Sequence, residues 1–500
     1  MTPLNPRLLR YTRILVEAVL AALLTGVVTS YGMTVPSAAA WLAKIQFLPA
    51  ALAFSLTTIV VWLIATLVFG RIYCSSVCPL GAFQDIFAKV FRLKENPRRD
   101  YHYAGPLTTL RRTTLFIVLA SVLLGISLIV SILDPFTIYS RFCIYVVKPI
   151  WGLVSNLVFP TPVRLAMASA TGILVATVTM VAIAWIAACR GRLLCNTLCP
   201  VGTTLGLVSK YSIFHIDINT DKCIECRHCE HVCKSQCIDL TSHVVDSSRC
   251  VVCFDCLPVC PNDAIHYTAS RHQLSIPLMQ KISDPVGGVT TASGSPKVDT
   301  SKATDRFMLD RRAFLAAGLV IAASPIIAKA KQSRELTGGL LDGQTPGEPK
   351  IAVTPPGVYN REDFLDRCTS CGLCISHCPT HVLVPSSTQY GLTRILHPVK
   401  DYDRAFCLIG CTRCSNLCPT GALTPLTKEE KRVNKVGIAR VYADRCIGCG
   451  RCERACPTEA IRLNDSRIAV VNAARCIGCG ACQYVCPARP AKAIIVNGLS

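Results

Sequence analysis

Cysteine spacing constrains this chain more than any other feature of its sequence. Six segments repeat one pattern, which reads C-x2-C-x2-C-x3-C in five of them and opens with C-x3-C in the fourth. Five of the six end in Cys-Pro, whereas Lys234 stands where the first would have its proline. The six sets are Cys223, Cys226, Cys229 and Cys233; Cys250, Cys253, Cys256 and Cys260; Cys368, Cys371, Cys374 and Cys378; Cys407, Cys411, Cys414 and Cys418; Cys446, Cys449, Cys452 and Cys456; and Cys476, Cys479, Cys482 and Cys486.

This spacing is typical of bacterial ferredoxins, in which three closely spaced thiolates hold one [4Fe–4S] cluster and the fourth reaches the neighbouring cluster. We therefore predict that these cysteines bind six [4Fe–4S] clusters as iron ligands. Crossing between the first two motifs places Cys260 with the first cluster and Cys233 with the second. The same crossing would join the third motif to the fourth and the fifth to the sixth, although four consecutive motifs permit other schemes. A structural zinc site also takes four thiolates, but it does not require three closely spaced cysteines and a fourth from another motif.

Two further cysteine pairs have a different pattern, C-x3-C-P. Cys74 and Cys78 lie in "CSSVCPLGAFQD", and Cys195 and Cys199 lie in "CNTLCPVGTTLG". Four thiols at one membrane surface could form another metal site or a redox dithiol, and we favour a redox role over structural thiols. Cys237 stands where ferredoxins usually have a small apolar residue, so we interpret it as packing. Two other cysteines have no partner pattern, Cys143 and Cys189.

Hydrophobic residues make up 51% of the chain and concentrate in its first 190 residues. The hydrocarbon core of a bilayer is about 30 Å thick, and a helix crosses it with about 20 apolar residues. The sequence therefore predicts a helical membrane domain, followed by α+β ferredoxin-like domains that bind [4Fe–4S] clusters. Four segments meet the required length, approximately Ile14–Met33, Phe47–Phe69, Thr113–Leu133 and Met167–Ala188.

Basic residues orient these four spans. The segment 71–112 holds eight Lys and Arg against three Asp and Glu, while the segment 34–46 holds only Lys44. Because cytoplasmic loops of membrane proteins are enriched in Lys and Arg, we expect the N-terminus and the 71–112 loop to be cytoplasmic. The chain then returns to the cytoplasm near Arg190, and the 134–166 loop lies outside, with its apolar stretches against the membrane surface.

Few polar groups within the spans point to a cofactor. The four spans contain no histidine, which argues against a haem held between two membrane histidines, and no C-x-x-C-H sequence predicts a covalent haem. Glu17 lies inside the first span and Asp134 at the end of the third. Carboxyls inside a membrane are candidates for function, here the uptake of quinol protons. For Glu17, a structural role as an interfacial or helix-paired side chain is as good an interpretation as proton uptake. For Asp134, the structural role is the better interpretation.

An unusual segment interrupts the cysteine motifs. Arg311–Arg312, then Phe314–Leu315 and a mildly apolar run, resemble a twin-arginine export signal, from which Asp310 and Ala316 depart. Such export carries folded proteins, so a cluster-loaded domain after this segment is expected outside the cytoplasm. The sequence Ala-Lys-Ala at 328–330 matches a cleavage site. Cleavage, retention as a fifth membrane anchor, and a chance Arg-Arg pair all stay open.

These features divide the chain into six parts. We place a four-helix membrane domain with both C-x3-C-P motifs at 1–200, a cytoplasmic two-cluster ferredoxin domain at 201–270, a linker at 271–305, the twin-arginine signal or anchor at 306–330, a second linker at 331–355 and a four-cluster ferredoxin domain at 356–500.

The net charge of +21 would ordinarily raise nucleic acid as a partner. Cytoplasmic loops and anionic thiolate-ligated clusters account for such a charge more simply, and the sequence contains no nucleic-acid recognition module. No G-x-G-x-x-G follows a strand, which counts against a nicotinamide nucleotide as electron donor. The expected partners are membrane lipid, quinol, and a periplasmic reductase or small electron carrier.

Two parts of the chain resemble known electron-transfer proteins. Residues 1–270 resemble the NapH membrane component of periplasmic nitrate reductase systems, with four spans, two C-x3-C-P pairs and two ferredoxin motifs. Residues 305–500, with "TPPGVYNREDFLDRCTSCGLCISHCP" at 354–379, resemble the NapG/MauM ferredoxins. The resemblance implies a quinol dehydrogenase of the bacterial inner membrane that delivers electrons to a periplasmic oxidoreductase such as nitrate reductase.

A second class of function uses similar motifs. Membrane proteins with C-x3-C-P pairs and ferredoxin motifs also serve the maturation or redox regulation of respiratory metalloenzymes. Only six methionines and no His-rich tract speak against copper handling. A third hypothesis keeps both ferredoxin domains in the cytoplasm.

Overall fold

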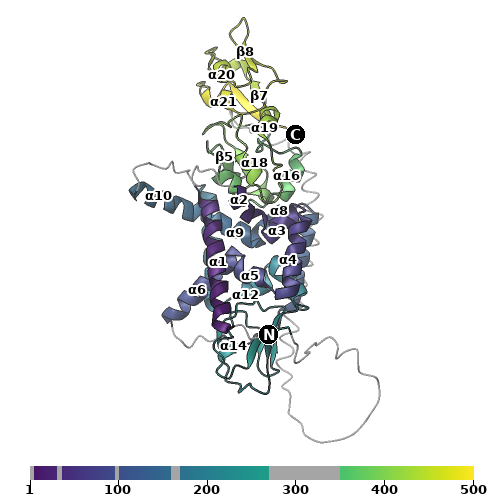
Figure 1. Cartoon of the computed structure of the whole chain (residues 1–500). Helices are drawn as coiled ribbons and strands as arrows, with labels where there is room; N and C mark the ends of the chain where they lie inside the picture. Colours follow the sequence, from purple (N-terminus) through teal and green to yellow (C-terminus); the bar gives the residue numbers. More distant parts are fainter. Residues whose placement is uncertain (1–4, 31–36, 96–100, 159–168, 270–348, 500) are drawn as a thin grey trace, which may run out of the picture.

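The computed structural model describes residues 5–30, 37–95, 101–158, 169–269 and 349–499. Figure 1 shows an elongated molecule with a helical body in the middle. One small domain, containing α14 (His228–Val232), lies at the end of the body near the N-terminus, and a larger one, containing α16 (Arg361–Arg367), lies at the opposite end. The predicted signal at 306–330, the linker at 271–305 and most of the linker at 331–355 lie outside the described residues.

The helical body contains fourteen elements within the described part of the chain. They are α1 (Pro6–Thr29), α2 (Ser37–Lys44), α3 (Phe47–Leu52), α4 (Leu56–Phe69), α5 (Ile72–Ser76), α6 (Pro79–Glu95), α7 (Thr108–Leu123), α8 (Ser127–Leu133), α9 (Pro135–Phe142), the π-helix η1 (Cys143–Val147), α10 (Lys148–Val158), α11 (Ala170–Arg190), α12 (Leu193–Thr197) and α13 (Pro200–Ser209). Because α13 packs against α4 and α7, the body extends to Ser209 rather than ending at residue 200.

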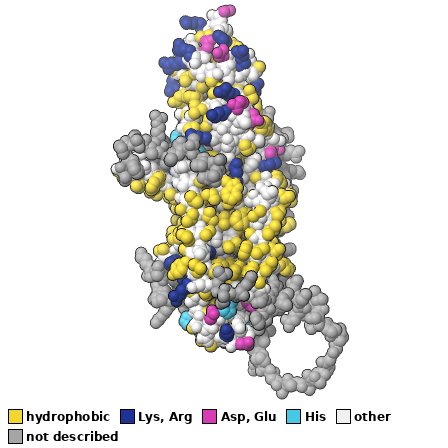
Figure 2. Space-filling model, viewed as in Figure 1, with side chains coloured by type: hydrophobic (Ala, Val, Ile, Leu, Met, Phe, Trp, Pro, Cys, Tyr) yellow, Lys and Arg dark blue, Asp and Glu magenta, His cyan; other side chains and the backbone are white. Residues whose placement is uncertain are grey.

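Two of these helices, α1 and α11, are long and apolar enough to cross a membrane, with 24 and 21 residues. The Asn5 side chain caps α1 by accepting from the Arg7 N–H at 3.1 Å, and Pro6 occupies the first turn. In Figure 2 apolar side chains cover the middle of the molecule, while Lys, Arg, Asp and Glu gather toward its two ends. The apolar helices and this apolar middle indicate membrane association.

The other two predicted spans are interrupted. The segment 47–69 is divided between α3 and α4, and the segment 113–133 between α7 and α8. Phe54 and Gly125 have positive φ angles of 53° and 65° at these breaks. At the second break Ile126 N–H donates to Ser121 O at 2.8 Å and Gly125 N–H to Val122 O at 3.3 Å, which is a Schellman helix end. Apolar composition predicts burial in lipid but does not reveal such breaks.

The expected external loop at 134–166 is largely helical. Asp134 caps α9 by accepting from Thr137 N–H at 3.0 Å and Thr137 Oγ1–H at 2.6 Å, and Pro135 starts the helix. At this point α8 and the α9–α10 segment form a helix pair bent by 74°, which is either a broken span or a re-entrant loop. Helix α9 is mostly buried against α11 and α6, so this part differs from the expected surface loop. Helix α10 does expose apolar side chains, including Trp151 and Leu157.

The two ferredoxin-like domains consist of short helices and two-stranded antiparallel sheets. The smaller contains β1 (His215–Ile218), α14, β2 (Ile238–Asp239), β3 (Val244–Val245) and β4 (Ile265–Thr268), with β1 paired to β4 and β2 to β3. The larger contains α16, α17 (Leu373–Ser376), β5 (Leu383–Pro385), η2 (Leu392–Arg394), β6 (Pro398–Lys400), α18 (Arg413–Leu417), α19 (Lys428–Val433), β7 (Gly437–Val441), η3 (Ala443–Arg445), α20 (Arg451–Arg454), β8 (Ile461–Leu463), β9 (Ala469–Val471), α21 (Ala481–Val485) and β10 (Ile494–Gly498).

The pairing in the larger domain also joins distant segments. Strand β10 pairs with β7, so the C-terminal strand closes the part of the domain that holds the last two motifs. Strand β5 pairs with β6 between the third and fourth motifs, and β8 pairs with β9 between the fifth and sixth.

The larger domain docks on the helical body through its third cysteine motif. Lys148 Nζ donates to Ser376 Oγ at 2.6 Å and to Ser376 O at 2.7 Å. Arg141 Nε donates to Ser370 O at 3.0 Å, and Ser140 Oγ donates to Cys371 O at 2.9 Å. The helix breaks belong to the same surface, because the Arg367 guanidinium lies 5.1 Å from the Phe54 ring centroid.

Gly125 gives a direct test of this docking surface. A Cβ atom at this position would lie 2.6 Å from both carboxylate oxygens of Asp366, and the positive φ angle disfavours any other residue. We expect Gly125→Ala to lower the free energy of unfolding by at least about 1 kcal/mol, measured by thermal denaturation in detergent. Gly26→Ala is the control, because a Cβ there meets nothing within 4 Å. Equal stability of the two variants would contradict the docked arrangement.

Candidate iron–sulfur sites

Four cavities in the ferredoxin-like domains are each lined by three cysteines of one motif and the last cysteine of another. The sets are Cys223, Cys226, Cys229 and Cys260; Cys250, Cys253, Cys256 and Cys233; Cys407, Cys411, Cys414 and Cys378; and Cys446, Cys449, Cys452 and Cys486. This is the crossed arrangement of a two-cluster ferredoxin.

The remaining motif cysteines form two more groups. The Cys374 thiol lies in electrostatic range of Cys371, Cys368 and Cys418. The Cys482 thiol lies in range of Cys479, Cys476 and Cys456. The third motif is therefore crossed with the fourth, and the fifth with the sixth, which selects one of the schemes that the sequence left open.

Apart from the exposed Cys449, the cysteines of these groups are partly or fully buried. In the described part of the chain, no three cysteine, histidine or acidic side chains close around a single metal ion. Burial raises the pKa of Cys229, Cys253 and Cys414 to about 12 each, because the charged thiolate loses its water. A bound iron–sulfur cluster would hold these thiols in their deprotonated form and would also occupy the cavity. The residues fit a thiolate-ligated cluster.

Backbone turns hold the motifs open toward these cavities. In five motifs the residues on both sides of the second cysteine have positive φ angles, as Gly448 and Gly450 do in the fifth. The first two motifs achieve the same turn without glycine, and Arg227 and Phe254 have φ angles of 62° and 60°. The fourth motif departs from this turn, because Thr412 has a φ of −114°. This motif has one more residue between its first two cysteines, and it lacks the positive φ angle that the other motifs have after the second cysteine.

Cys237 lies closer to a cavity than the sequence indicated. It is 1% exposed, lines the same cavity as Cys233 and Cys250, and its Sγ lies 3.6 Å from Cys233 Sγ. We expected Cys237 to be a buried packing residue, and it is buried. The structure adds that it is a fifth thiol at this cavity, and the irregular ending of the first motif was the only signal in the sequence.

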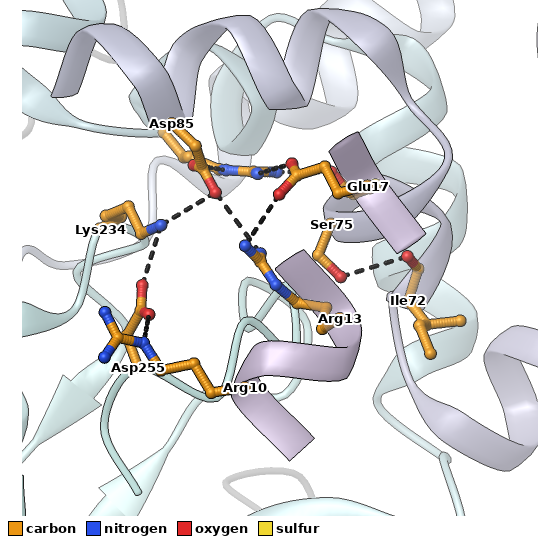
Figure 3. A network of polar contacts seen from close by, with 10 residues as sticks. Arg10, Arg13, Glu17, Ile72, Ser75, Asp85, Lys234 and Asp255 are labelled. Atoms are coloured by element: carbon orange, nitrogen blue, oxygen red, sulfur yellow. Dashed lines mark hydrogen bonds and ion pairs between the residues drawn. The ribbon is translucent and has the colours of Figure 1, made fainter. Parts of the chain in front are cut away.

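Lys234, which replaces the proline of the first motif, joins the smaller domain to the helical body. Its Nζ lies 2.9 Å from Asp85 Oδ2 on α6 and 2.8 Å from Asp255 Oδ2 in the second motif (Figure 3). Burial alone would raise the pKa of Asp255, but Lys234 and Arg10 lower that pKa overall. The replacement of proline is therefore a structural feature of this interface.

The same charged network contains Glu17. Its Oε2 accepts from Arg13 Nη2 at 2.8 Å, and Arg13 also contacts Asp85 (Figure 3). Arg192 Nε lies 2.7 Å from the other oxygen of Asp85. Glu17 is thus an ion-paired side chain, whereas Asp134 caps α9, a role not expected from the sequence.

The two C-x3-C-P pairs converge inside the helical body. Cys74, Cys78, Cys195 and Cys199 are 5–7% exposed, and each of the four thiols lies in electrostatic range of the other three. We call this group the four-cysteine cage. Three of its members, Cys74, Cys78 and Cys199, belong to a hydrophobic cluster with Tyr73 and Met180. Cys143 is buried in another cluster of the body, and Cys189 is exposed.

Family models of iron–sulfur domains match several parts of the chain. A "4Fe-4S binding domain" model matches residues 51–98 and again 172–219, which contain the two halves of the four-cysteine cage. A "4Fe-4S dicluster domain" model matches residues 406–460 and 445–489, and a further "4Fe-4S binding domain" model matches residues 363–384.

Curated relatives match parts of the chain at low identity. An uncharacterised protein of Methanocaldococcus jannaschii is 23% identical over 36% of this chain and 58% of its own length. The methylamine utilization ferredoxin-type protein MauM of Methylobacillus flagellatus is 28% identical over 20% of this chain and 43% of its own, and that of Methylophilus methylotrophus is 32% identical over 19% and 41%. The chain thus spans less than two thirds of these relatives. No solved structure matches.

These similarities and the cysteine-lined cavities define the general class of the chain. It is an iron–sulfur electron-transfer protein with [4Fe–4S] domains of the ferredoxin type, related to MauM-type ferredoxins, and its apolar helices indicate membrane association.

Lys234 offers a test of the interface at the smaller domain. We expect Lys234→Met to lower the free energy of unfolding by about 2 kcal/mol, because Asp255 and Asp85 stay buried with one cation fewer. Denaturation followed by cluster absorbance measures this change. Lys428→Met on the exposed face of α19 is the control, and a Lys234 variant as stable as this control would refute the role of the bridge.

His397 makes the opposite interface sensitive to acid. The ring is 1% exposed, lies 2.9 Å from Ser370 Oγ and 3.4 Å from Ser127 Oγ of α8, and burial lowers its pKa to about 4. Folding therefore favours the neutral ring. The stability that this group contributes is complete above its unfolded pKa, near 6.5, and is lost as the pH falls toward 4.

Acidification tests this assignment. Between pH 7 and 5 we expect the wild-type protein to lose about 2 kcal/mol of unfolding free energy more than His397→Asn does. Parallel denaturation series at several pH values measure the difference, and His215→Asn, outside this interface, serves as control. Identical pH slopes for the wild-type protein and His397→Asn would contradict the prediction.

Proposed function

We propose that this chain is a quinol dehydrogenase component of a bacterial inner membrane. It takes electrons from menaquinol or ubiquinol and passes them, through its iron–sulfur centres, to a periplasmic oxidoreductase such as nitrate reductase. One observation carries the proposal. Two ferredoxin-like domains are docked at opposite ends of one apolar helical body, each with a cysteine motif against that body (Figure 1).

The proposal assigns the motif cysteines as ligands of six [4Fe–4S] clusters, four in the larger domain and two in the smaller. When bound, such clusters supply one-electron acceptors whose potentials depend on hydrogen bonds to sulfur and on exposure. The chain contributes thiolates and buried backbone N–H groups. Ala264 N–H donates to Cys260 Sγ at 3.2 Å, and Ala460 N–H donates to Cys456 Sγ at 3.2 Å. These bonds stabilise the thiolate form.

The topology proposed is cytoplasmic for the smaller domain and periplasmic for the larger one. The Lys- and Arg-rich segment 71–112 supports this orientation, because α5 and α6 lie near the smaller domain (Figure 1). The Arg311–Arg312 segment would export the larger domain in its folded state. Because the relatives are named for methylamine utilization, nitrate reductase is one example of the acceptor rather than a unique choice.

Reduction by quinol is the direct test. Under anaerobic conditions, adding a quinol to the full chain in lipid nanodiscs is expected to produce the electron paramagnetic resonance signals of reduced clusters, because each quinol releases two electrons and two protons. The oxidised quinone at the same concentration is the control. Clusters that dithionite reduces but quinol leaves unchanged would overturn the proposal.

A role in metalloenzyme maturation predicts a different result in cells. Deleting the gene of an electron-supply protein abolishes the quinol-dependent activity of the periplasmic enzyme, while artificial electron donors restore it. If artificial donors fail to restore activity, the enzyme itself is incomplete, and the maturation function is favoured.

A further inference from the structure

The two halves of the four-cysteine cage are copies of one structural unit. Segments 70–81 and 191–202 share the pattern Gly-Arg-x-x-Cys-x3-Cys-Pro-x-Gly. In each copy an apolar helix ends at the glycine, a five-residue helix bears the first cysteine, and the second cysteine precedes the next helix. Each copy of the pattern contains only two cysteines. A centre with four thiolate ligands therefore requires both copies.

Each copy places its arginine against the other. Arg192 Nη1 donates to Cys74 O at 2.5 Å, and Arg71 Nη2 donates to Cys195 O at 3.4 Å. The glycines make room for these contacts. A Cβ on Gly81 would lie 3.0 Å from Arg192 Nη1, and a Cβ on Gly202 would lie 2.7 Å from Arg71 Nη2. The two copies thus form one site with approximate twofold symmetry.

Among the residues that the structure describes, no carboxylate forms a salt bridge with the buried guanidinium of Arg71. The residue is 0% exposed. Its Nη atoms donate to neutral groups, Asn196 Oδ1 at 2.8 Å and Ser248 O at 3.1 Å, while Nε has no hydrogen-bond partner. Burying an unpaired cation costs several kcal/mol. Cys74 can become anionic, and its Sγ lies 3.7 Å from Nη2.

We propose that Cys74, Cys78, Cys195 and Cys199 together hold one additional iron–sulfur centre inside the helical body, shared by the two copies. Four thiolates give such a centre a net negative charge, and the guanidinium of Arg71 beside Cys74 would offset part of it. The N–H of Gly202 donates to Cys199 Sγ at 3.4 Å. Iron–sulfur clusters of both two and four irons take four cysteine ligands.

The position of the cage favours a redox centre over a structural metal. Val251, between two cysteines of the second motif, belongs to the same hydrophobic cluster as Cys74 and Cys199, and Cys253 packs against that cluster. Arg71 spans the contact, because it also donates to the carbonyls of Ser248 and Arg249, just before Cys250. The cage therefore adjoins the cavity of the second motif directly.

On the other side, the cage faces the larger domain through packed side chains. Tyr73 lies in electrostatic range of Cys78 and of Asp134, and Asp134 lies in range of Cys371 in the third motif. Tyr139 packs against the cluster of the cage and against the cluster that contains Cys371. The additional centre would thus stand between the two ferredoxin-like domains.

This inference deepens the proposed function and rests on it for the source of electrons. Quinol is the reductant. The additional centre gains one electron as a neighbouring cluster loses one, and it returns to its oxidised state as it reduces the next. Electrons could then cross the helical body within one polypeptide, without a haem.

Removing one ligand from each copy tests the site. We expect the full-length wild-type protein to contain more iron and acid-labile sulfide than six cubanes account for. The double variant Cys74→Ser/Cys195→Ser should lose that excess and one paramagnetic signal, while it retains the iron of six clusters, which also shows that it folds. Cys143→Ser, which removes a buried thiol of the body outside the cage, should retain the excess. Equal iron in the wild-type protein and the double variant, or zinc in place of the excess iron, would overturn the proposal.

A charge variant tests the role of Arg71 without removing a ligand. Reduction adds negative charge beside this guanidinium, so Arg71→Gln should lower the midpoint potential of the additional signal. Arg111→Gln is the matched control, because Arg111 also donates to Ser248 but has no hydrogen bond to the cage cysteines. An unchanged potential in Arg71→Gln would contradict the charge pairing.

The two proposals fail separately. If quinol reduces the six clusters but the double variant loses no iron, the additional centre is refuted and the proposed function stands. If the excess iron is present but quinol reduces no cluster, the site stands and quinol oxidation is refuted.

Discussion

The burial of cysteine thiols in apolar surroundings is the constraint on which the rest of this structure depends. A thiolate without water is costly unless a metal or a cation compensates its charge. The ferredoxin-like domains meet this constraint with cavities that three-plus-one cysteines line. The helical body meets it with the fully buried Arg71, whose guanidinium lies beside the Cys74 thiol. The same reasoning accounts for Lys234, whose charge is placed between two buried carboxylates.

Docking of the two small domains gives the helical body its irregular shape. The helix ends at Phe54 and Gly125 present backbone and side chains to the larger domain. At the opposite end, the network of Arg13, Asp85 and Lys234 joins the first helix to the smaller domain (Figure 3). The body is therefore as much a spacer between two redox domains as it is a membrane anchor.

Local patterns in the sequence predicted more than long-range contacts could. Cysteine spacing indicated which thiols gather around each cavity, because ligands of one motif are only a few residues apart. The first and last apolar segments are the helices α1 and α11, but the breaks at residues 54 and 125 depend on helix-end hydrogen bonds that composition does not reveal. The convergence of Cys74 with Cys195 depends on the packing of two repeats that lie far apart in the chain. For the same reason, the role of Lys234 was visible only as a missing proline.

We propose that one polypeptide places redox domains on the two faces of a membrane. The most direct test of this proposal is the sidedness of two epitopes, one in the exposed turn at residues 241–242 and one after Ser500, probed by antibody in intact and lysed spheroplasts. If the two domains lie on opposite faces, the epitope after Ser500 is accessible in intact spheroplasts, and the epitope in the smaller domain becomes accessible only after lysis. Accessibility of both epitopes from the same side would contradict the proposal.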